Sequence, residues 1–279
     1  MTEVLRYAAF TAQGRGGNPA GVVLDATGLS DDEMLRIAAE VGYSETAFLT
    51  EHRGSDHYRV RYFAPLQEVP FCGHATIATG VALAERGAGE SMVFETNAGP
   101  VAVHTRSADG EIVAELTSVA PSSEAADEEL VVAALGALRW RRDELDSGYP
   151  IEVADAGARH LVLVTRTRER LADLDYDFEA LAVLMRARRL ITLQLIWPET
   201  AERYHSRNPF PPGGVIEDPA TGAAAAALGG YLRKHSKVAH DATFTISQRV
   251  DMGRPSEITV RMSADDPGVR VSGAAHPIV

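Results

Sequence analysis

Glu45 is the first residue whose type and place in the sequence suggest chemistry. It lies in the segment Ser-Glu-Thr-Ala-Phe (44–48), between the end of a predicted helix and a predicted strand with apolar neighbours. An apolar pocket favours the protonated form of a carboxylic acid, which suits such a group to proton transfer near neutral pH. From this segment alone, a surface glutamate at the start of a strand is the more common alternative.

His74 follows Cys72 and Gly73 at the predicted start of a helix, in the segment Phe-Cys-Gly-His-Ala-Thr (71–76). The free backbone N–H groups and the positive dipole end of a helix can hold a carboxylate or a developing enolate. His74 could donate a hydrogen bond to the same group. The alternative is a helix start with a packing role only.

Asp218 precedes a second predicted helix, in the segment Gly-Gly-Val-Ile-Glu-Asp-Pro-Ala-Thr-Gly (213–222). An Asp at this place can cap the helix, and Pro219 is compatible with its first turn. Capping is the more common role, and a substrate-orienting carboxylate is the alternative. Asn18, in the Gly-rich turn 14–19, offers a side-chain amide beside backbone donors.

Several cofactor and metal patterns are missing from the sequence. The turn 14–19 lacks the glycine spacing of a dinucleotide-binding loop, and neither a Walker-type loop nor a Gly-x-Ser-x-Gly segment occurs. The pairs His52 and His57, and His235 and His240, are five residues apart, which does not fit the zinc-binding His-Glu-x-x-His pattern. The sequence therefore predicts no metal site and makes a NAD-dependent enzyme a remote alternative.

Cys72 is the single cysteine, so the chain cannot form an internal disulfide or a Cys-rich zinc site. It also cannot supply the two opposed thiols of a two-thiol racemase, and we interpret it as a small buried apolar side chain. A reducing, cytoplasmic location fits this cysteine usage. The N-terminal segment does not resemble a signal peptide, and we expect no membrane span.

The chain has 279 residues, a formal net charge of −12, 45% hydrophobic residues and 24% charged residues. This composition is that of a globular protein and argues against disorder, collagen and coiled coil. The acidic balance argues against binding to nucleic acid or to an anionic membrane. It does not exclude an anionic small substrate, because a binding site is local and net charge is global.

The predicted elements repeat in two halves, with a linker at Val119–Glu124. Each half contains a helix of mostly small residues, at 75–85 and 221–234, and a helix that is apolar on all faces is usually buried. We therefore predict a duplicated α/β architecture with one buried helix per half; a parallel Rossmann layout is the alternative.

Ser30 and Glu33 predict a capping box, and Tyr204 is expected to begin a loop. Strands are also predicted at 4–10, 21–24, 46–50, 57–63, 92–95, 101–105, 112–116, 151–153, 160–165, 190–196, 242–247 and 257–262, and further helices at 127–138 and 177–188.

A series of motifs, in order along nearly the whole chain, resembles the PhzF-like (phenazine biosynthesis) family. The motifs are Gly-Asn-Pro-Ala-Gly-Val-Val (17–23), Ser-Glu-Thr-Ala-Phe (44–48), Glu-Val-Pro-Phe-Cys-Gly-His-Ala-Thr (68–76), Tyr-His-Ser-Arg (204–207), Glu-Asp-Pro-Ala-Thr-Gly (217–222) and Gly-Arg-Pro-Ser (253–256). The resemblance implies a diaminopimelate-epimerase-like α/β (α+β) fold. Its two similar domains would each wrap a sheet around a central helix, with the active site in the cleft between them. We expect domains at 1–120 and 121–267, the first completed by a C-terminal strand at 268–279.

The resemblance also assigns residues. Glu45 matches the family's acid/base, with His74 beside it and Asp218 as a second carboxylate of the site. The predicted substrate-binding residues are Asn18, Gly73, Ala75, Thr221, Gly222 and Ala223. Ala223 stands where the family usually has serine, which removes one hydroxyl contact, and Pro219 stands near the second thiol position of related epimerases. Basic residues that either contact the ligand or pair with carboxylates elsewhere are Arg15, His205, Arg207 and Arg254.

These features predict a cofactor-independent isomerase that moves a proton on a small carboxylic acid. The resemblance implies a small anionic metabolite as substrate, a homodimer and no cofactor. Two alternatives stay open at this point: a one-base epimerase of an amino or hydroxy acid, and a noncatalytic protein that binds a small ligand.

Overall fold

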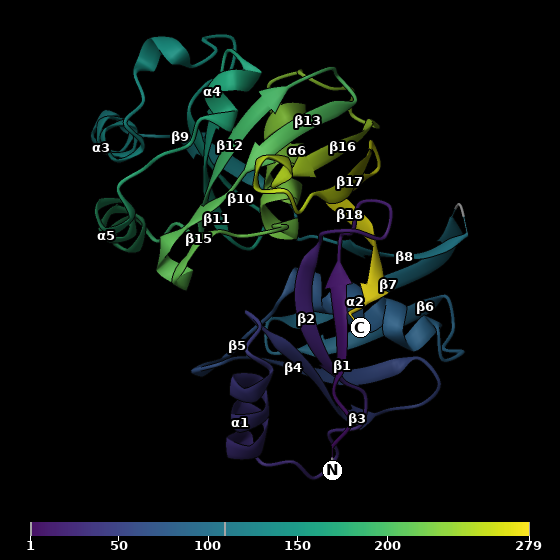
Figure 1. The fold of residues 1–279 in the computed structure, drawn as a ribbon. Coiled ribbons are helices and arrows are strands. Elements are labelled where there is room, and N and C mark those ends of the chain that lie inside the picture. Colours follow the sequence, from purple (N-terminus) through teal and green to yellow (C-terminus); the bar gives the residue numbers. More distant parts are fainter. Residues whose placement is uncertain (1, 109, 279) are drawn as a thin grey trace. The chain divides into compact units, whose positions relative to one another are not determined.

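The computed structural model describes residues 2–108 and 110–278, and these form two compact units (Figure 1). The first unit comprises Met1–Thr117 and Ser272–Val279, and the second comprises Ser118–Val271. The chain therefore leaves the first unit once, builds the second, and returns to the first within its last strand. Among the described residues, no helix combines the length and the apolar character needed to cross a membrane.

The first unit is a closed barrel, to which the described residues contribute eight strands. In spatial order these are β1 (Leu5–Ala9), β2 (Asn18–Val23), β3 (Thr46–His52), β4 (His57–Ala64), β6 (Ser91–Thr96), β7 (Gly99–Ala108), β8 (Glu111–Thr117) and the last part of β18 (Asp266–Pro277). Antiparallel pairing of β1 with β18 closes the ring, with Ala9 opposite Ala275. The short strand β5 (Gln67–Val69) pairs with β4.

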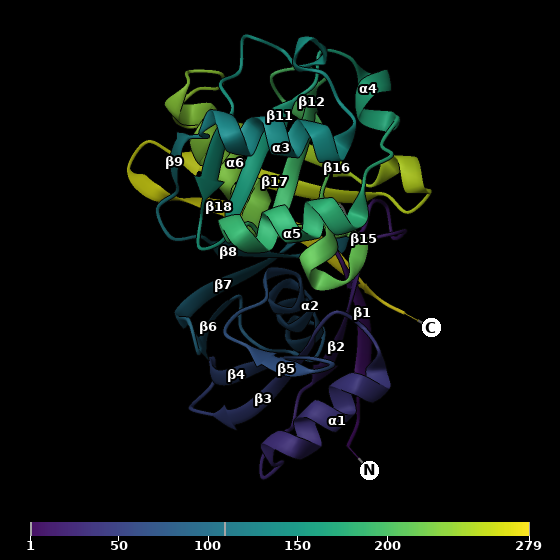
Figure 2. The same cartoon turned by 90° about the vertical axis from the view of Figure 1, so that its left-hand side faces the viewer.

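Helix α2 (Gly73–Ala84) runs among the barrel strands and is buried from His74 to Leu83 (Figures 1 and 2). Small side chains allow the strands to approach it closely. A Cβ on Gly80 would lie 2.9 Å from Val103 Cγ1 and 3.3 Å from the Ala114 side chain. This confirms the prediction of a buried small-residue helix in the first half.

Helix α1 (Asp31–Val41) packs on the outside of this barrel through Met34, Ile37 and Ala38. The predicted capping box is confirmed: Ser30 accepts from the backbone N–H of Glu33, and the Glu33 carboxylate accepts from the backbone N–H of Ser30. Gly42 ends the helix in the left-handed conformation, with φ of 72°. The chain can therefore turn sharply toward β3.

The second unit has its own sheet around α6 (Gly222–Lys234). Its strands are, in spatial order, the first part of β18, β17 (Ser256–Ser263), β16 (Thr243–Gln248), β13 (Arg203–Arg207), β12 (Thr192–Pro198), β11 (Arg159–Val164), β10 (Glu152–Asp155) and β9 (Ser122–Ala125). On the face opposite α6, α3 (Glu128–Leu138) and α5 (Phe178–Arg188) bury a leucine-rich core (Figure 2). The remaining elements are α4 (Arg168–Ala172), the hairpin β14 (Pro209–Phe210) and β15 (Val215–Glu217), and short 3-10 turns at Arg142–Glu144, Pro211–Gly213 and Val250–Met252.

Two sequence predictions are wrong in this unit. The expected loop at Tyr204 is the central strand β13, which pairs with β12 on one side and β16 on the other. The polar sequence of β13 does not indicate a strand. Tyr204 and Ser206, which are two residues apart, are nevertheless both buried, as on one face of a strand. The second half of the predicted linker Val119–Glu124 lies in the edge strand β9, where polar side chains can remain exposed.

The sheets of both units are mainly antiparallel and enclose a helix. Parallel pairs are confined to β2–β3 and β4–β6 in the first unit and β11–β12 and β13–β16 in the second, among the strand registers described. This arrangement confirms the predicted diaminopimelate-epimerase-like fold class and contradicts the Rossmann alternative.

Candidate active site

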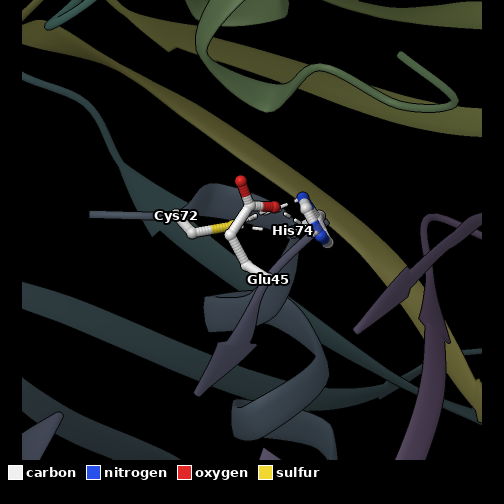
Figure 3. Close-up of side chains that lie close together, drawn as sticks. All are labelled: Glu45, Cys72 and His74. Carbon is white, nitrogen blue, oxygen red and sulfur yellow. Dashed lines mark hydrogen bonds and ion pairs between the residues drawn. The ribbon is translucent and has the colours of Figure 1, made fainter. Parts of the chain in front are cut away.

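The side chains of Glu45, Cys72 and His74 meet at the start of α2 (Figure 3). Glu45 Oε2 lies 3.5 Å from Cys72 Sγ and 3.5 Å from His74 Nε2. The sulfur lies 3.4 Å from His74 Nδ1. A carboxyl group, a thiol and an imidazole are all able to exchange protons, so the cluster has the chemistry of an acid/base centre.

The barrel fixes the position of Glu45 through the residues on either side of it. Its carbonyl oxygen accepts from the Gly21 backbone N–H over 3.2 Å, and the next residue, Thr46, is paired with Gly21 in the β2–β3 register. A Cβ on Gly21 would lie only 2.6 Å from Thr46 Oγ1. Glycine at this position therefore lets β2 and β3 pack closely at the point where Glu45 leaves the sheet.

His74 is the second residue of α2, and its side chain is 8% exposed, against 20% for Glu45. Ser44 Oγ lies 3.4 Å from His74 Nε2, on the same nitrogen that faces Glu45. The imidazole is therefore enclosed while the carboxylate retains access to solvent. Glu45 directly precedes β3, as the alternative of a glutamate at a strand start has it, but it is only partly exposed and contacts Cys72 and His74.

A buried hydrogen-bond chain supports the cluster from behind. The Thr76 hydroxyl donates to the Cys72 carbonyl oxygen over 2.7 Å, and Tyr62 Oη lies 2.6 Å from Thr76 Oγ1. Burial raises the pKa of the Tyr62 hydroxyl far above its usual value, so this group stays protonated. We infer that Tyr62 and Thr76 hold the start of α2 in place and take no part in proton exchange.

The first turn of α2 adds backbone donors to the cluster. Cys72 occupies the N-cap but, within the described chain, its side chain makes no capping hydrogen bond. The first N–H groups of a helix have no partner inside the helix, and they carry its positive dipole end. Gly73 and Ala75, both predicted to bind substrate, supply two of these groups beside the Glu45 carboxylate.

The second unit carries a different polar cluster at the start of α6. Thr221 donates from its hydroxyl to Asp218 Oδ2 over 2.6 Å. The Gln248 side chain donates to the Asp218 carbonyl oxygen over 2.7 Å and accepts from the Thr221 backbone N–H over 3.2 Å. Gln248 is buried at 1% exposure, so the loop before α6 is anchored to the end of β16.

Capping of α6 by Asp218, the more common role for such a residue, is not what the structure shows. The N-cap is Thr221, and in the described structure it makes no side-chain capping bond. The helix begins at Gly222, too late in the chain for Asp218 to be its N-cap residue. Gly222 and Ala223 lie in the first turn of the helix and are partly exposed, and Ala223 brings no hydroxyl to it.

Several basic residues of the motifs have structural partners. Arg207 forms a buried ion pair with Glu217, with Nε 3.0 Å from Oε2, and donates to the Ala172 carbonyl oxygen over 2.7 Å. His205 Nε2 lies 2.9 Å from Glu199 Oε2. Burial, followed by the neighbouring positive charge of Arg254, lowers the pKa of Arg249. The negative charges of Glu217 and Asp218 act on the pKa of Arg249 in the opposite direction.

The predicted site residues thus fall into two groups. Glu45, Gly73, His74 and Ala75 come together in the first unit, while the second holds Asp218, Thr221, Gly222 and Ala223. Asn18 begins β2 opposite Ala9 and is buried at 1% exposure. Sequence reasoning missed Cys72 as a member of the site and missed Gln248; the place of Cys72 directly before Gly73 and His74 was the available signal.

Comparison with known proteins places this geometry in a family. The sequence model of the phenazine biosynthesis-like protein family PhzC-PhzF matches residues 7–279. The chain is 31% identical over 255 residues to trans-2,3-dihydro-3-hydroxyanthranilate isomerase of Pseudomonas chlororaphis, covering 91% of this chain and 87% of that protein. The chain belongs to the PhzF family.

Other relatives of this PhzF-family chain agree. It is 32% identical over 281 residues to a Bacillus subtilis protein named an uncharacterized isomerase, covering 97% of this chain and 94% of the relative. The crystal structure of a PhzF-family protein of Bacillus anthracis superposes with a TM-score of 0.89 at 28% identity, covering 99% and 96% of the two chains. A probable proline racemase of Agrobacterium radiobacter shares the fold at a TM-score of 0.66 and 14% identity, covering 100% of this chain and 91% of its own. The predictions of an enzyme and of an isomerase are confirmed.

Proposed function

We propose that this PhzF-family enzyme isomerises a small carboxylic acid without a cofactor, with Glu45 as the group that carries the proton. The observation that supports this most directly is the contact of the partly exposed Glu45 carboxylate with His74 at the N-terminus of α2. A carboxylate at this place can reach a bound molecule and can exchange its proton next to a second polar group.

The proposed reaction moves one proton and creates no net charge. The Glu45 carboxylate removes a proton from a carbon next to an unsaturated or carbonyl group, and the electron pair of the C–H bond spreads into the conjugated system. His74 and the backbone N–H groups of Gly73 and Ala75 stabilise the negative charge. Protonated Glu45 then returns the proton to a different carbon, which shifts the double bond and restores the carboxylate.

The residues at the start of α6 are proposed to bind the polar groups of the substrate. Asp218 and Thr221 are held by Gln248, while Gly222 and Ala223 leave the first turn of the helix uncrowded. Arg249 directly follows Gln248, which contacts Thr221, and so adds positive charge near this helix start, which favours an anionic substrate. Asn18 is proposed as a further polar contact. A homodimer is also part of the proposal, from family likeness.

The first compound to test is trans-2,3-dihydro-3-hydroxyanthranilate, because two Pseudomonas relatives are named as its isomerases. Other unsaturated or carbonyl-containing carboxylic acids form the wider panel. Ala223 provides no hydroxyl at the start of α6. We therefore expect the best substrate to have one polar group fewer than trans-2,3-dihydro-3-hydroxyanthranilate at this place.

The experiment compares Glu45→Gln with the parent chain in D₂O, using NMR to follow both product and deuterium. Glutamine keeps the shape and removes the base, so we expect turnover to fall by about 10²–10⁴-fold. Glu40→Gln is the matched control, since Glu40 is an exposed helix residue that forms an ion pair with Arg36. The turnover of this variant should stay within about twofold of the parent.

The same experiment separates the alternatives. Deuterium at a new carbon with movement of a double bond supports isomerisation. Deuterium with inversion at one α-carbon would replace this proposal with an epimerase. Parental turnover by Glu45→Gln would refute the role of Glu45, and ligands that raise the melting temperature without any proton exchange would indicate a noncatalytic binding protein.

A further inference from the structure

The acid/base cluster presents three different metal-binding atoms at short mutual distances. Glu45 offers a carboxylate oxygen, Cys72 a sulfur and His74 a ring nitrogen, all within 4.8 Å of one another. Cys72 Sγ lies 3.5 Å from Glu45 Oε2 and 3.9 Å from His74 Nε2, and that nitrogen lies 3.5 Å from the same oxygen. The three atoms form a nearly equilateral triangle (Figure 3).

The size of this triangle fits a tetrahedral metal ion. Zinc bonds of about 2.3 Å to sulfur and about 2.0–2.2 Å to nitrogen and oxygen place neighbouring ligand atoms about 3.3–3.6 Å apart. One point inside the observed triangle lies about 2.1 Å from all three atoms. This distance is close to the length of a zinc bond. An ion could therefore bind with small side-chain movements.

The ligand types and charges also select the ion. Thiolate, imidazole and carboxylate together suit Zn²⁺ and Cd²⁺, whereas Mg²⁺ and Ca²⁺ prefer oxygen ligands alone. The two negative charges of carboxylate and thiolate balance a divalent cation. Glu45 remains 20% exposed, which leaves a side open for entry of the ion and for a water as fourth ligand.

We propose that Glu45, Cys72 and His74 form a zinc-binding site, and that bound Zn²⁺ inhibits the enzyme. The ion would hold the Glu45 carboxylate and the His74 imidazole, so neither could serve the substrate. The binding statement stands on the cluster alone, while the inhibition rests on the proposed function.

The first test measures metal binding without any substrate. The full chain, stripped of metal with a chelator, is titrated with Cd²⁺ while the ultraviolet absorption of the Cd–thiolate bond is recorded, and Zn²⁺ is then added as competitor. We expect one Cd²⁺ per chain, displacement by Zn²⁺ and none by Mg²⁺. Cys72→Ser should remove the thiolate band, and His74→Asn should weaken Cd²⁺ binding by about 10-fold or more.

His57→Asn is the matched control, because His57 also faces a carboxylate in the first unit, Glu95 at 2.9 Å, away from any thiol. It should bind Cd²⁺ like the parent. Absence of a thiolate band in the parent, or His74→Asn binding as tightly as His57→Asn, would overturn the site.

The second test adds Zn²⁺ to the proton-exchange assay, with each protein's rate without metal as its own reference. We expect at least 10-fold inhibition of the parent and of His57→Asn at saturating Zn²⁺, reversed by a chelator. A parent that binds metal yet keeps its full rate would overturn inhibition alone. A parent with no turnover of any acid would refute the proposed function and leave the spectroscopic result standing.

Discussion

The starts of α2 and α6 look alike in sequence and differ in how they hold their side chains. Both helices begin with glycine after a residue that gives no side-chain cap within the described chain, and both are buried by a surrounding sheet. At α2 the contacts of Glu45 and His74 are long, at 3.4–3.5 Å. At α6 the contacts of Asp218, Thr221 and Gln248 are hydrogen bonds of 2.6–3.2 Å.

This difference suggests a division of labour between the two helix starts. A group that gains and loses a proton in each turnover benefits from weak contacts, because strong hydrogen bonds would fix one protonation state. Groups that shape a backbone benefit from short bonds to buried partners. Substitutions at α2 should therefore act mainly on the rate of proton transfer, and substitutions around α6 mainly on stability and on substrate binding.

The largest predicted effect on stability is at the buried ion pair of Arg207 and Glu217, just before the loop that leads into α6. Glu217→Gln removes the charge that compensates Arg207, whose side chain is 8% exposed, so we expect a loss of about 3–5 kcal/mol in the free energy of unfolding. Glu45→Gln should cost about 1 kcal/mol or less, because Glu45 retains contact with water. Urea unfolding of both variants provides the measurement.

A loss below about 1 kcal/mol in Glu217→Gln, or a loss in Glu45→Gln as large as in Glu217→Gln, would contradict the proposed division.

Gln248 gives the next prediction. Gln248→Leu keeps an apolar volume at the end of β16 but leaves the Thr221 backbone N–H and the Asp218 carbonyl oxygen without their partner. We expect a loss of about 1–3 kcal/mol in stability. Because the α6 loop would loosen, the KM should rise more than kcat falls, and steady-state kinetics on the active substrate tests this. Gln248→Leu with parental KM and stability would show that the loop holds its shape without this side chain.

The smallest predicted effect is on the pH dependence of stability and comes from a buried histidine. His160 in β11 is fully buried, with Nδ1 2.8 Å from Thr192 Oγ1, and burial lowers its pKa to about 3. The unfolded chain takes up a proton near pH 6.5 while the folded chain does not, so stability falls as the pH drops from about 6.5 toward 3. Relative to pH 8, we expect a contribution of about 1 kcal/mol to be lost by pH 6.

His160→Asn should remove this part of the pH dependence, measured as the difference between the two proteins in urea unfolding at pH 8 and pH 6. Equal pH dependence in both would mean that His160 is accessible to protons in the folded state.

The sequence contained much of the fold, because its buried helices are unusual. Runs of small residues in α2 and α6 can be buried on all sides only if sheets close around them, so these runs predict the duplicated architecture. The capping box at Ser30 was equally clear, since it depends on local residues. Motifs in order then pointed to Glu45 and His74.

The missed parts depend on distant partners. Strand β13 is polar in sequence, and pairing with β12 and β16, which lie before and after it in the chain, makes it a central strand. Gln248 is 27 residues from Thr221 and appeared as the polar end of an ordinary strand. Cys72 seemed an inert small side chain because its neighbour Glu45 is also 27 residues away.

The path of β18 has a consequence for how the protein is made. This strand starts in the second unit and ends beside β1, so the barrel of the first unit is sealed by residues 272–277. A ribosome must release the whole second unit before that seal can form. Until then the nascent barrel keeps open strand edges, which are prone to pair with other chains. The first unit is therefore synthesised first but completed last. Chaperones that bind incompletely folded chains have the longest time to act on this unit.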